Sequence, residues 1–557
     1  MRGATGRVLA RSPRSSCSRI GPDAPGWTLH FLEAPPNFFV HRSRALTWRP
    51  VLPQASNVFL MFDTVLVANR GEIAVRIIRA CRDMGLRSVA VYSDADRLSP
   101  HVLLADQALS IGGAPAAESY LRGDRIIEAA QISGAGAIHP GYGFLAERAR
   151  FAQDVEESGL VFIGPRPASI QAMGDKIEAR RRMSEAGIPI VPGGEDPVRD
   201  SREALRLAED LGFPALLKAV AGGGGKGMRL VHNAAEMSAA FEAAVREAGA
   251  AFGDDSIYVE KFLLRPRHIE FQILADDSGN VLHLGERECS IQRRHQKLIE
   301  EAPSTVLTPT ERVEMGAVAV QAARAVDYRG VGTVEFLYDE GNFYFLEMNT
   351  RLQVEHPVTE LVTGLDLVEW QIRVARGEPL GFSQDDVSVT GHAIECRITS
   401  EDPRRDFLPS AGRIDYLAIP AGPGIRWDGG IASGFEVSLH YDPLLGKLIV
   451  HAENRAGAIR RMKRALDELE VSGIATCVPF HRRVMSEEDF ANGRLSVAYV
   501  EEHPELFGDY AEDHRVAALM AAVLEHEHRS RRLVSRSDGR RGTQLSTWRA
   551  SGWPWKK

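Results

Sequence analysis

The chain has 557 residues, too many for one hydrophobic core, so two to four domains are expected. Its five cysteines lie far apart and form no CxxC pair, which indicates neither a disulfide framework nor a zinc site. No run of about 18 apolar residues could span a membrane. The net charge of −8 comprises +6 in residues 1–60, +8 in residues 529–557 and −22 between them. This acidic body argues against nucleic acid as the main partner.

Residues 1–60 show no clear hydrophobic period and scatter Arg, Pro and Ser, so we expect an unstructured extension. The first twenty residues contain five Arg, four Ser and no acid, as in an organellar transit peptide. The same composition fits an upstream start codon read through untranslated sequence. Met61 directly precedes the first predicted strand, which favours Met61 as the functional start. The expected location is therefore cytoplasmic, or the mitochondrial matrix if residues 1–60 are a transit peptide.

From residue 64 onwards, short apolar strands alternate with helical periodicity, which predicts an α/β fold with a doubly wound parallel sheet. The predicted strands are Thr64–Ala68, Ser88–Tyr92, Ala137–Ile138 and Val161–Ile163, and the helices are Glu72–Met84, Ile126–Ala130 and Phe151–Glu157. The loops that begin at His139 and Gly164 follow strand ends, where such sheets bind ligands. Asn69-Arg70-Gly71 is not a GxGxxG motif, so a nicotinamide cofactor is not supported.

A glycine-rich loop follows the predicted helix Lys176–Ala186 and the short strand Ala215–Ala219, which holds Lys218. Residues 222–227 are glycines interrupted only by Lys226, and Met228–Val231 is the next predicted strand. Bare backbone N–H groups can wrap phosphate oxygens, and Lys226 adds a point charge. The alternative is a flexible linker, but linkers usually add Ser and Pro. No GK[ST] follows, so this is not a Walker A loop.

The middle of the chain continues with a predicted strand, turn and strand from Ile257 to Glu270, which include His268. The basic patch 293–297 lies among Glu286, Glu288, Glu300 and Glu301, which favours a charged, anion-binding cleft over a solvated face. The remaining predicted elements are helices at 366–376, 455–468 and 516–526, strands at 391–398, 439 and 448–450, and a disordered tail.

Residues 332–349 predict a β-hairpin with strands Thr333–Tyr338 and Phe343–Asn349. A two-residue loop at Glu340-Gly341 would place Glu335 and Glu347 on opposite faces. A three-residue loop would place these two carboxylates directly across from each other. Opposed carboxylates repel, so that register makes sense if a hard cation lies between them.

Beyond Glu347 every odd position is polar: Glu347, Asn349, Arg351, Gln353 and Glu355. An extended chain would direct all five to one side, which would carry Mg²⁺ ligands, an anion-binding guanidinium and a carboxylate base. The alternative is a half-buried strand with a solvated face, although such faces seldom lack Lys.

Together these motifs closely resemble biotin carboxylase, the ATP-grasp subunit or domain of acyl-CoA carboxylases, from about Met61 to Phe507. The resemblance is carried by Val67–Ala74, His139–Leu145, Met173–Lys176, Gly222–Met228, Gln292–Lys297, Glu347–Glu360 and Glu395–Arg397. It implies an N-terminal domain at 61–174, an ATP-grasp domain at 175–381 with a lid at about 190–262, and a C-terminal domain at 388–508. Residues 509–557 would then form a helix and a disordered basic tail.

The resemblance also implies roles for individual residues. ATP contacts would come from Lys176, Lys218, Gly222, Gly223, Gly224, Gly225, Lys226, Gly227, His268, Gln292 and His295, with Glu260, Lys261 and Leu263 near the adenine. Divalent ions, Mg²⁺ or Mn²⁺, would be held by Glu335, Glu347 and Asn349. Bicarbonate would be held by Lys297, Arg351, Gln353 and the Val354 backbone, with Glu355 as base. Arg397 would face the ureido oxygen of biotin.

The implied activity is ATP- and bicarbonate-dependent carboxylation of biotin on a biotin carboxyl carrier protein, by way of carboxyphosphate. This is the first half-reaction of an acyl-CoA carboxylase, whose partners include a carboxyltransferase subunit, and the resemblance suggests a homodimer. The sequence contains no Ala-Met-Lys-Met site, so biotin is expected on another protein. Ala146-Glu147-Arg148 departs from the usual Ser-Glu-Asn. The alternatives are an ATP-grasp ligase with another acceptor and a silent nucleotide-binding subunit.

Overall fold

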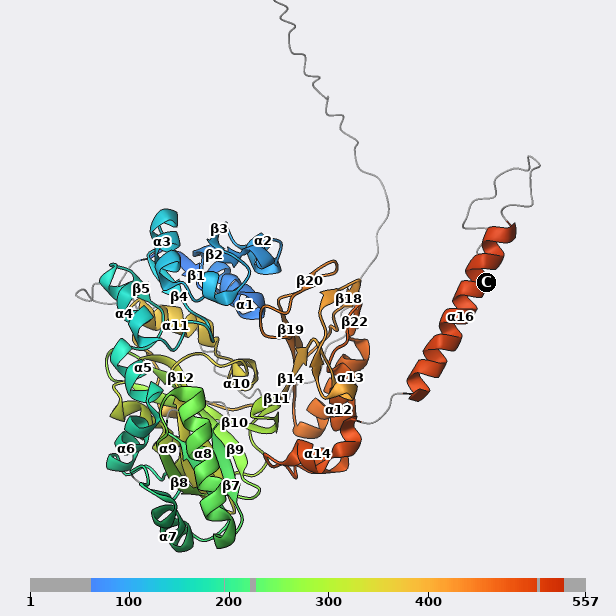
Figure 1. Ribbon diagram of the computed structural model, residues 1–557. Coiled ribbons are helices and arrows are strands. Elements are labelled where there is room, and N and C mark those ends of the chain that lie inside the picture. The colour runs from blue at the N-terminus through green and yellow to red at the C-terminus, as the bar shows by residue number, and fades with distance from the viewer. Residues whose placement is uncertain (1–61, 195, 221–226, 508–510, 535–557) are drawn as a thin grey trace, which may run out of the picture. The chain divides into compact units, whose positions relative to one another are not determined.

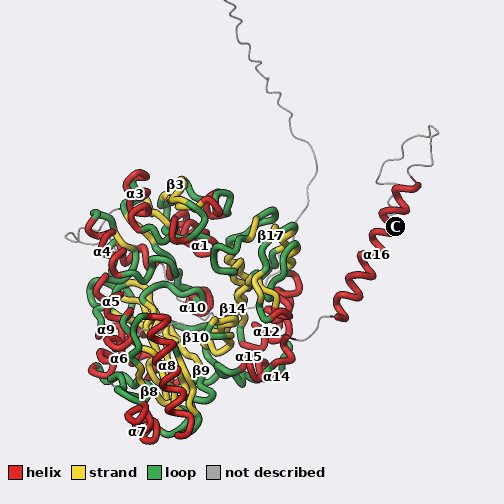
Figure 2. The backbone as a smooth tube through the Cα atoms, viewed as in Figure 1, coloured by secondary structure: helices red, strands yellow, loops and turns green. Residues whose placement is uncertain are grey.

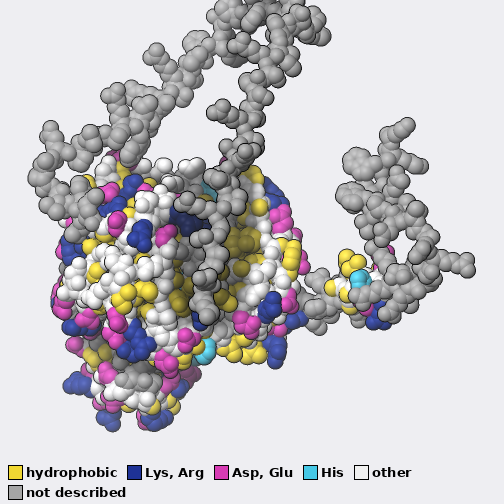
Figure 3. All heavy atoms as spheres, turned by 90° about the horizontal axis from the view of Figure 1, so that it is seen from above, with side chains coloured by type: hydrophobic (Ala, Val, Ile, Leu, Met, Phe, Trp, Pro, Cys, Tyr) yellow, Lys and Arg dark blue, Asp and Glu magenta, His cyan; other side chains and the backbone are white. Residues whose placement is uncertain are grey.

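The computed structural model describes residues 62–194, 196–220, 227–507 and 511–534. The predicted extension 1–60, Met61 and the tail 535–557 lie outside these residues. Among the described residues, no helix is both long and apolar enough to cross a bilayer. On the face shown in Figure 3, acidic and basic side chains are interspersed.

The N-terminal region is a parallel α/β sheet. Its elements are β1 (Thr64–Val67), α1 (Gly71–Asp83), β2 (Arg87–Ser93), α2 (Pro100–Leu104), β3 (Gln107–Gly112), α3 (Gly123–Ser133), β4 (Ala137–His139), α4 (Ala149–Glu157), β5 (Val161–Phe162) and α5 (Pro167–Gly174). The five strands are parallel, in the order β3-β2-β1-β4-β5, and α1, α3 and α4 pack against them (Figure 1). All four residues of β1 are buried, as expected for the centre of such a sheet. The doubly wound prediction is confirmed.

A small antiparallel sheet is formed by strands that precede and follow the glycine-rich loop in the sequence. Its strands are β6 (Ala215–Ala219), β7 (Met228–Val231) and β8 (Ile257–Lys261), in the order β7-β6-β8. The helices of this region are α6 (Lys176–Glu185), α7 (Ser201–Leu211) and α8 (Met237–Phe252). Helix α7 begins after Asp200, whose carboxylate accepts hydrogen bonds from two backbone N–H groups of the first turn. Alanine-rich faces of α7 and α8 pack with the three strands around one apolar core.

The largest sheet has eight antiparallel strands. They are β9 (Arg267–Ala275), β10 (Val281–Arg293), β11 (Gln296–Ala302), β12 (Gly330–Asp339), β13 (Asn342–Asn349), β14 (His392–Thr399), β19 (Ile425–Gly429) and β21 (Leu444–Ala452). Their order is β13-β12-β9-β10-β11-β14-β21-β19, so one sheet joins the 267–349 segment to the 392–452 segment. Helices α9 (Pro309–Ala325), α10 (His356–Thr363) and α11 (Leu367–Ala375) accompany it. Helix α9 lies beside β9 and β10 (Figure 2).

The C-terminal region adds short strands and helices. The strands are β15 (Glu401–Asp402), β16 (Leu408–Pro409), β17 (Gly412–Arg413), β18 (Tyr416–Ala418), β20 (Glu436–Val437) and β22 (Glu470–Ser472); the helices are α12 (Arg455–Glu468), α13 (Val478–Val484), α14 (Glu488–Ala491), α15 (Tyr499–Glu502) and α16 (Ala511–Val534). Helix α12 buries Ile459, Met462 and Leu466 against β14 and β21.

Several predicted elements have the observed bounds, among them the strands 215–219 and 228–231 and the helix 455–468. The helix predicted at 516–526 is longer, as α16 shows. The strand predicted at Leu439 is wrong. Leu439 lies in a turn, where the Ser438 hydroxyl accepts a hydrogen bond from the His440 backbone, and its side chain is exposed.

Candidate active site

The β12–β13 hairpin combines parts of the two predicted registers. Asp339 pairs with Asn342, so the loop is the two-residue turn Glu340-Gly341, and both of these residues have positive φ. A bulge between Phe345 and Glu347 then shifts the register by one residue, and Glu335 pairs with Glu347. Glu335 is therefore opposite Glu347 even though the turn is the short one.

A third carboxylate extends this row. Glu335 on β12 also pairs with Glu270 on the neighbouring strand β9. Three adjacent strands thus place Glu270, Glu335 and Glu347 side by side. Like charges in this arrangement repel, so the fold requires cations here.

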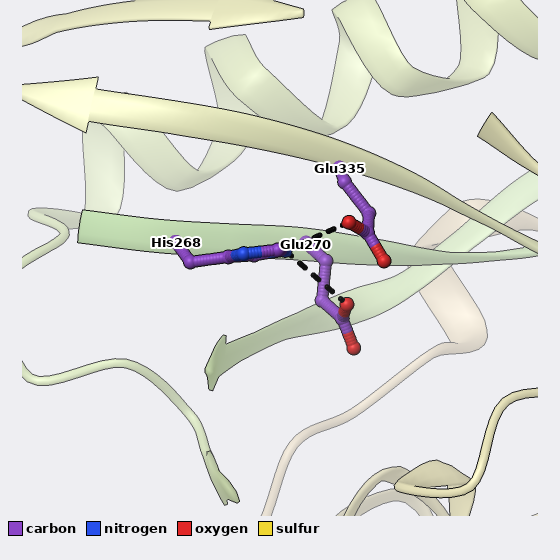
Figure 4. A group of neighbouring side chains, drawn as sticks. All are labelled: His268, Glu270 and Glu335. Atoms are coloured by element: carbon purple, nitrogen blue, oxygen red, sulfur yellow. Dashed lines mark ion pairs between the residues drawn. The ribbon is translucent and has the colours of Figure 1, made fainter. Parts of the chain in front are cut away.

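Two basic side chains supply part of that positive charge. The Lys297 ammonium lies 2.6 Å from Glu270, 3.0 Å from Glu335 and 2.6 Å from Glu355. His268 Nε2 lies 2.9 Å from Glu335 and 3.9 Å from Glu270. Dashed lines in Figure 4 mark these two ion pairs. Burial alone would raise the pKa of Glu335, but Lys297 and His268 outweigh it and hold that pKa well below its usual value. Glu335 is therefore a carboxylate at neutral pH.

The predicted run of alternating polar residues is not extended throughout. Strand β13 ends at Asn349, and residues 351–355 form a bend and a turn before α10. Pro357 lies at the start of α10 and Glu355 is its N-cap residue, which fixes the chain direction at this point. The prediction of one extended strand is wrong, yet the five polar residues do line one cavity.

That cavity has a volume of about 1060 Å³. The predicted site residues in its lining are Lys218, Glu260, Lys261, Leu263, His268, Gln292, His295, Lys297, Glu335, Glu347, Asn349, Arg351, Gln353, Val354, Glu355 and Arg397. Gly227 is not among the lining residues. Gly222, Gly223, Gly224, Gly225, Lys226 and the Lys176 side chain lie outside the described part of the structure.

Glu355 lies between two cations in this cavity. Its oxygens accept hydrogen bonds from Lys297 at 2.6 Å and from Arg397 at 2.9 Å. Burial would raise the pKa of Glu355, but the charges of Lys297, Arg397 and Arg287 lower it below the usual value. A buried carboxylate held in this way is available as a hydrogen-bond acceptor and base.

Arg397 has a second carboxylate partner. Its Nε lies 2.5 Å from Glu300, which is fully buried on β11. Burial raises the pKa of Glu300 to about 7, despite the opposing charge of Arg397. Glu300 is therefore partly protonated near neutral pH.

Arg351 is held by the N-terminal region. Its Nε donates to Glu147 at 2.8 Å, and its Nη2 donates to the Asn349 side-chain oxygen at 2.9 Å. The unusual Ala146-Glu147-Arg148 segment therefore keeps the acid that contacts Arg351.

The other end of the cavity is formed by the small sheet. Lys218 on β6 and Arg180 on α6 both form ion pairs with Glu260 on β8. Its partner Glu260 holds the partly buried Lys218 ammonium against this wall, a few residues before the glycine-rich segment in the sequence. A cation at this position can contact a phosphate group.

The donor set around the carboxylate row fits a hard divalent cation. Glu335, Glu347 and Asn349 offer oxygen atoms, which Mg²⁺ and Mn²⁺ prefer. With a neutral imidazole, His268 would also join Glu270 and Glu335 in placing one potential ligand atom each within 4.8 Å of one another. The repulsion between the paired carboxylates is the structural reason for a cation here.

Sequence reasoning did not select Glu270 or Glu147, and it gave no role to Arg287. The signal for Glu270 was present: His268, Glu270 and Gln272 alternate with the apolar Ile269 and Phe271, so they share one face of β9. Glu147 has no comparable signal, because its contact joins segments that are 204 residues apart.

Three family models match successive parts of the chain. Residues 61–170 match the family described as biotin carboxylase, N-terminal domain; residues 175–383 match the carbamoyl-phosphate synthase L chain ATP-binding domain; and residues 395–502 match the biotin carboxylase C-terminal domain.

Relatives cover nearly the same span. Biotin carboxylase of Nostoc sp. is 54% identical over 444 residues, covering 80% of this chain and 99% of that protein. A pyruvate carboxylase subunit of Methanothermobacter thermautotrophicus is 53% identical over 443 residues, covering 80% and 90%.

A solved structure is also similar. The biotin carboxylase domain dimer of 2-oxoglutarate carboxylase from Hydrogenobacter thermophilus, in complex with MgADP, ADP and bicarbonate, has a TM-score of 0.77 at 49% identity, covering 81% of this chain and 99% of that one. The chain belongs to the biotin carboxylase family and is an ATP-dependent ligase of the ATP-grasp type.

Proposed function

We propose that this chain uses ATP and bicarbonate to carboxylate biotin carried on a separate biotin carboxyl carrier protein, as the first half-reaction of an acyl-CoA carboxylase. The observation that carries the proposal is the position of Glu355, a buried carboxylate between Lys297 and Arg397 in a cavity that Arg351 and Gln353 also line.

Bicarbonate is a weak nucleophile, so a base and anion-binding groups must act on it together. Lys297, Arg351, Gln353 and the Val354 backbone hold the anion. Glu355 accepts its proton as the bicarbonate oxygen attacks the terminal phosphorus of ATP, whose bond to ADP breaks. The lowered pKa of Glu355 keeps it ionised at neutral pH, while the same positive charges make it a weaker base than a free carboxylate.

Nucleotide binding uses the opposite end of the cavity. Lys218, His268, Gln292 and His295 contact ATP, together with Lys176 and the 222–227 segment, while Glu260, Lys261 and Leu263 lie near the adenine. Glu335, Glu347 and Asn349 hold Mg²⁺ or Mn²⁺, which when bound offsets the negative charge of the phosphates.

The product of this step, carboxyphosphate, hydrolyses readily, so water must be excluded from the cavity. The 190–262 segment closes over the site and shields it. Breakdown of carboxyphosphate gives CO₂ and phosphate. The phosphate takes the proton from N1 of biotin, and N1 then attacks CO₂ to form carboxybiotin. Arg397 stabilises the ureido oxygen, where negative charge develops.

The domain division at 61–174, 175–381 and 388–508, the cytoplasmic location and the carboxyltransferase partner are part of the same proposal. A homodimer is supported by the dimer named for the Hydrogenobacter relative. Two relatives, one named for pyruvate carboxylase and the other for 2-oxoglutarate carboxylase, favour a 2-oxoacid as a second candidate for the final acceptor.

The test is phosphate release from ATP by the full chain and by residues 61–557, with Mg²⁺ and bicarbonate, with and without free biotin. We expect biotin to stimulate release, and Arg351→Ala and Glu355→Gln to lower kcat by about 10²–10⁴-fold, the range for a missing base or positioning group. Bicarbonate-dependent cleavage without biotin stimulation would indicate another acceptor. ATP binding without cleavage would indicate a silent subunit.

A further inference from the structure

Arg287 on β10 is a fully buried arginine whose hydrogen-bonding capacity is completely used. Its side chain is 0% exposed. A guanidinium has five N–H donors and no acceptor. All five have partners: Nε donates to Glu270 at 2.5 Å, Nη1 to Gln272 at 2.6 Å and Thr359 at 3.0 Å, and Nη2 to Thr333 at 3.1 Å and Gln353 at 2.6 Å.

The first consequence is the orientation of the Gln353 side chain. Because Arg287 can only donate, the oxygen of the Gln353 amide must face it, and the amide nitrogen must face the other way. That nitrogen donates to Glu335 at 2.6 Å. Gln353 therefore presents an N–H donor on the side of the carboxylate row. There it can donate a hydrogen bond to an anion or to an oxygen atom that coordinates a cation.

The second consequence concerns Lys297. One oxygen of Glu270 accepts from Arg287 at 2.5 Å, and the other accepts from Lys297 at 2.6 Å. Since Glu270 is fully buried and one of its oxygens is fixed by the Arg287 Nε–H, its other oxygen holds the Lys297 ammonium in a defined place. Arg287 thus acts directly on one cavity-lining residue and through Glu270 on another.

We propose that Arg287 is the positioning residue of the bicarbonate site, which sets the Gln353 amide directly and Lys297 through Glu270. The proposal rests on the proposed function, because Gln353 and Lys297 are its bicarbonate ligands. Arg287 lies behind both side chains and is absent from the cavity lining, so it acts on the anion only through them.

Arg287→Lys in the full chain is the test. Lysine keeps the charge but lacks the planar guanidinium, so it cannot donate hydrogen bonds to Glu270 and Gln353 in the same geometry. We expect the KM for bicarbonate to rise by about tenfold or more, the usual effect of removing a group that orients a binding residue, while the KM for MgATP changes less than about threefold.

Thr359→Val is the matched control. It removes one of the five hydrogen bonds to Arg287, at 3.0 Å, but leaves those to Glu270 and Gln353 in place. We expect a lower thermal midpoint with the KM for bicarbonate unchanged within about twofold. An equal rise in both variants would mean general loosening of the core and would overturn the proposal.

The remaining outcomes are distinct. An active wild-type chain whose Arg287→Lys variant keeps its KM for bicarbonate would refute the positioning role alone. A wild-type chain without bicarbonate-dependent ATP cleavage would refute the proposed function. If neither Arg287→Lys nor Arg287→Gln folds in the presence of MgADP, Arg287 belongs to the fold rather than the site, and the proposal is overturned.

Discussion

Glu300→Gln tests quantitatively how burial and the charge of Arg397 together affect the pKa of Glu300. Glu300 is fully buried, and burial raises its pKa from 4.5 to about 7, with Arg397 and Lys297 opposing and Glu355 reinforcing the rise. Because the folded state holds this proton more tightly than the unfolded chain does, Glu300 contributes stability below pH 4.5. That contribution is lost as the pH rises towards 7.

The magnitude follows from the two pKa values. At about 1.4 kcal/mol per pKa unit, the change from 4.5 to about 7 corresponds to about 3 kcal/mol. Glutamine does not titrate, so the free energy of unfolding of the wild type should fall by this amount relative to Glu300→Gln between about pH 4.5 and 8. With an unfolding entropy of about 2 cal/mol/K per residue, this is a relative shift of about 3 °C in the thermal midpoint.

The assay is thermal unfolding of both proteins at several pH values across this window. Glu436→Gln, which changes an exposed glutamate on β20, is the control and should run parallel to the wild type. A constant offset between wild type and Glu300→Gln at every pH would refute the reasoning. It would mean that Arg397 keeps Glu300 ionised throughout.

Three further substitutions test the packing around the site. The ammonium of Lys447 is fully buried; it donates to the Val354 carbonyl at 2.8 Å and pairs with Glu72 at 3.2 Å. Lys447→Met should therefore lower the free energy of unfolding, measured by urea titration, by about 3–5 kcal/mol. A loss below about 1 kcal/mol would contradict this. Gly430→Ala should lower the thermal midpoint, since a Cβ there would lie 2.5 Å from the Glu72 backbone nitrogen; an unchanged midpoint would show that the loop can move at no cost. Thr308→Ala should cost about 1 kcal/mol because it removes the capping box of α9, and a cost near zero in urea titrations would mean that water replaces the cap.

Local chemistry explains what could be predicted about the fold. Pro214 precedes the strand 215–219 and Gly227 precedes the strand 228–231, while the helix 455–468 begins after the N-cap Asn454 and has a clear apolar face. Leu439 shows the limit of this reasoning. One apolar residue carries no period, and the Ser438 turn determined its conformation.

The candidate site also has features that the sequence predicts and features that it does not. Glu335, Glu347, Asn349, Arg351 and Glu355 were identifiable because they lie close together in sequence and share one chemical pattern. The pairing of Glu335 with Glu347 was not identifiable, because the turn residues predict the register only up to Phe345 and the bulge at Leu346 then shifts it by one residue.

The sequence by itself determined the α/β class, the order of the elements and the kinds of side chain that the chemistry requires. Only the tertiary structure decided which of them meet. Glu147 reaches Arg351 from the N-terminal region, and Arg287 gathers Glu270 and Gln353 from separate segments. Such contacts depend on the packing of distant elements, whose relative positions no local propensity specifies. For that reason the residues to which we assign the chemistry were visible in the sequence, whereas those that contact them from distant segments were not.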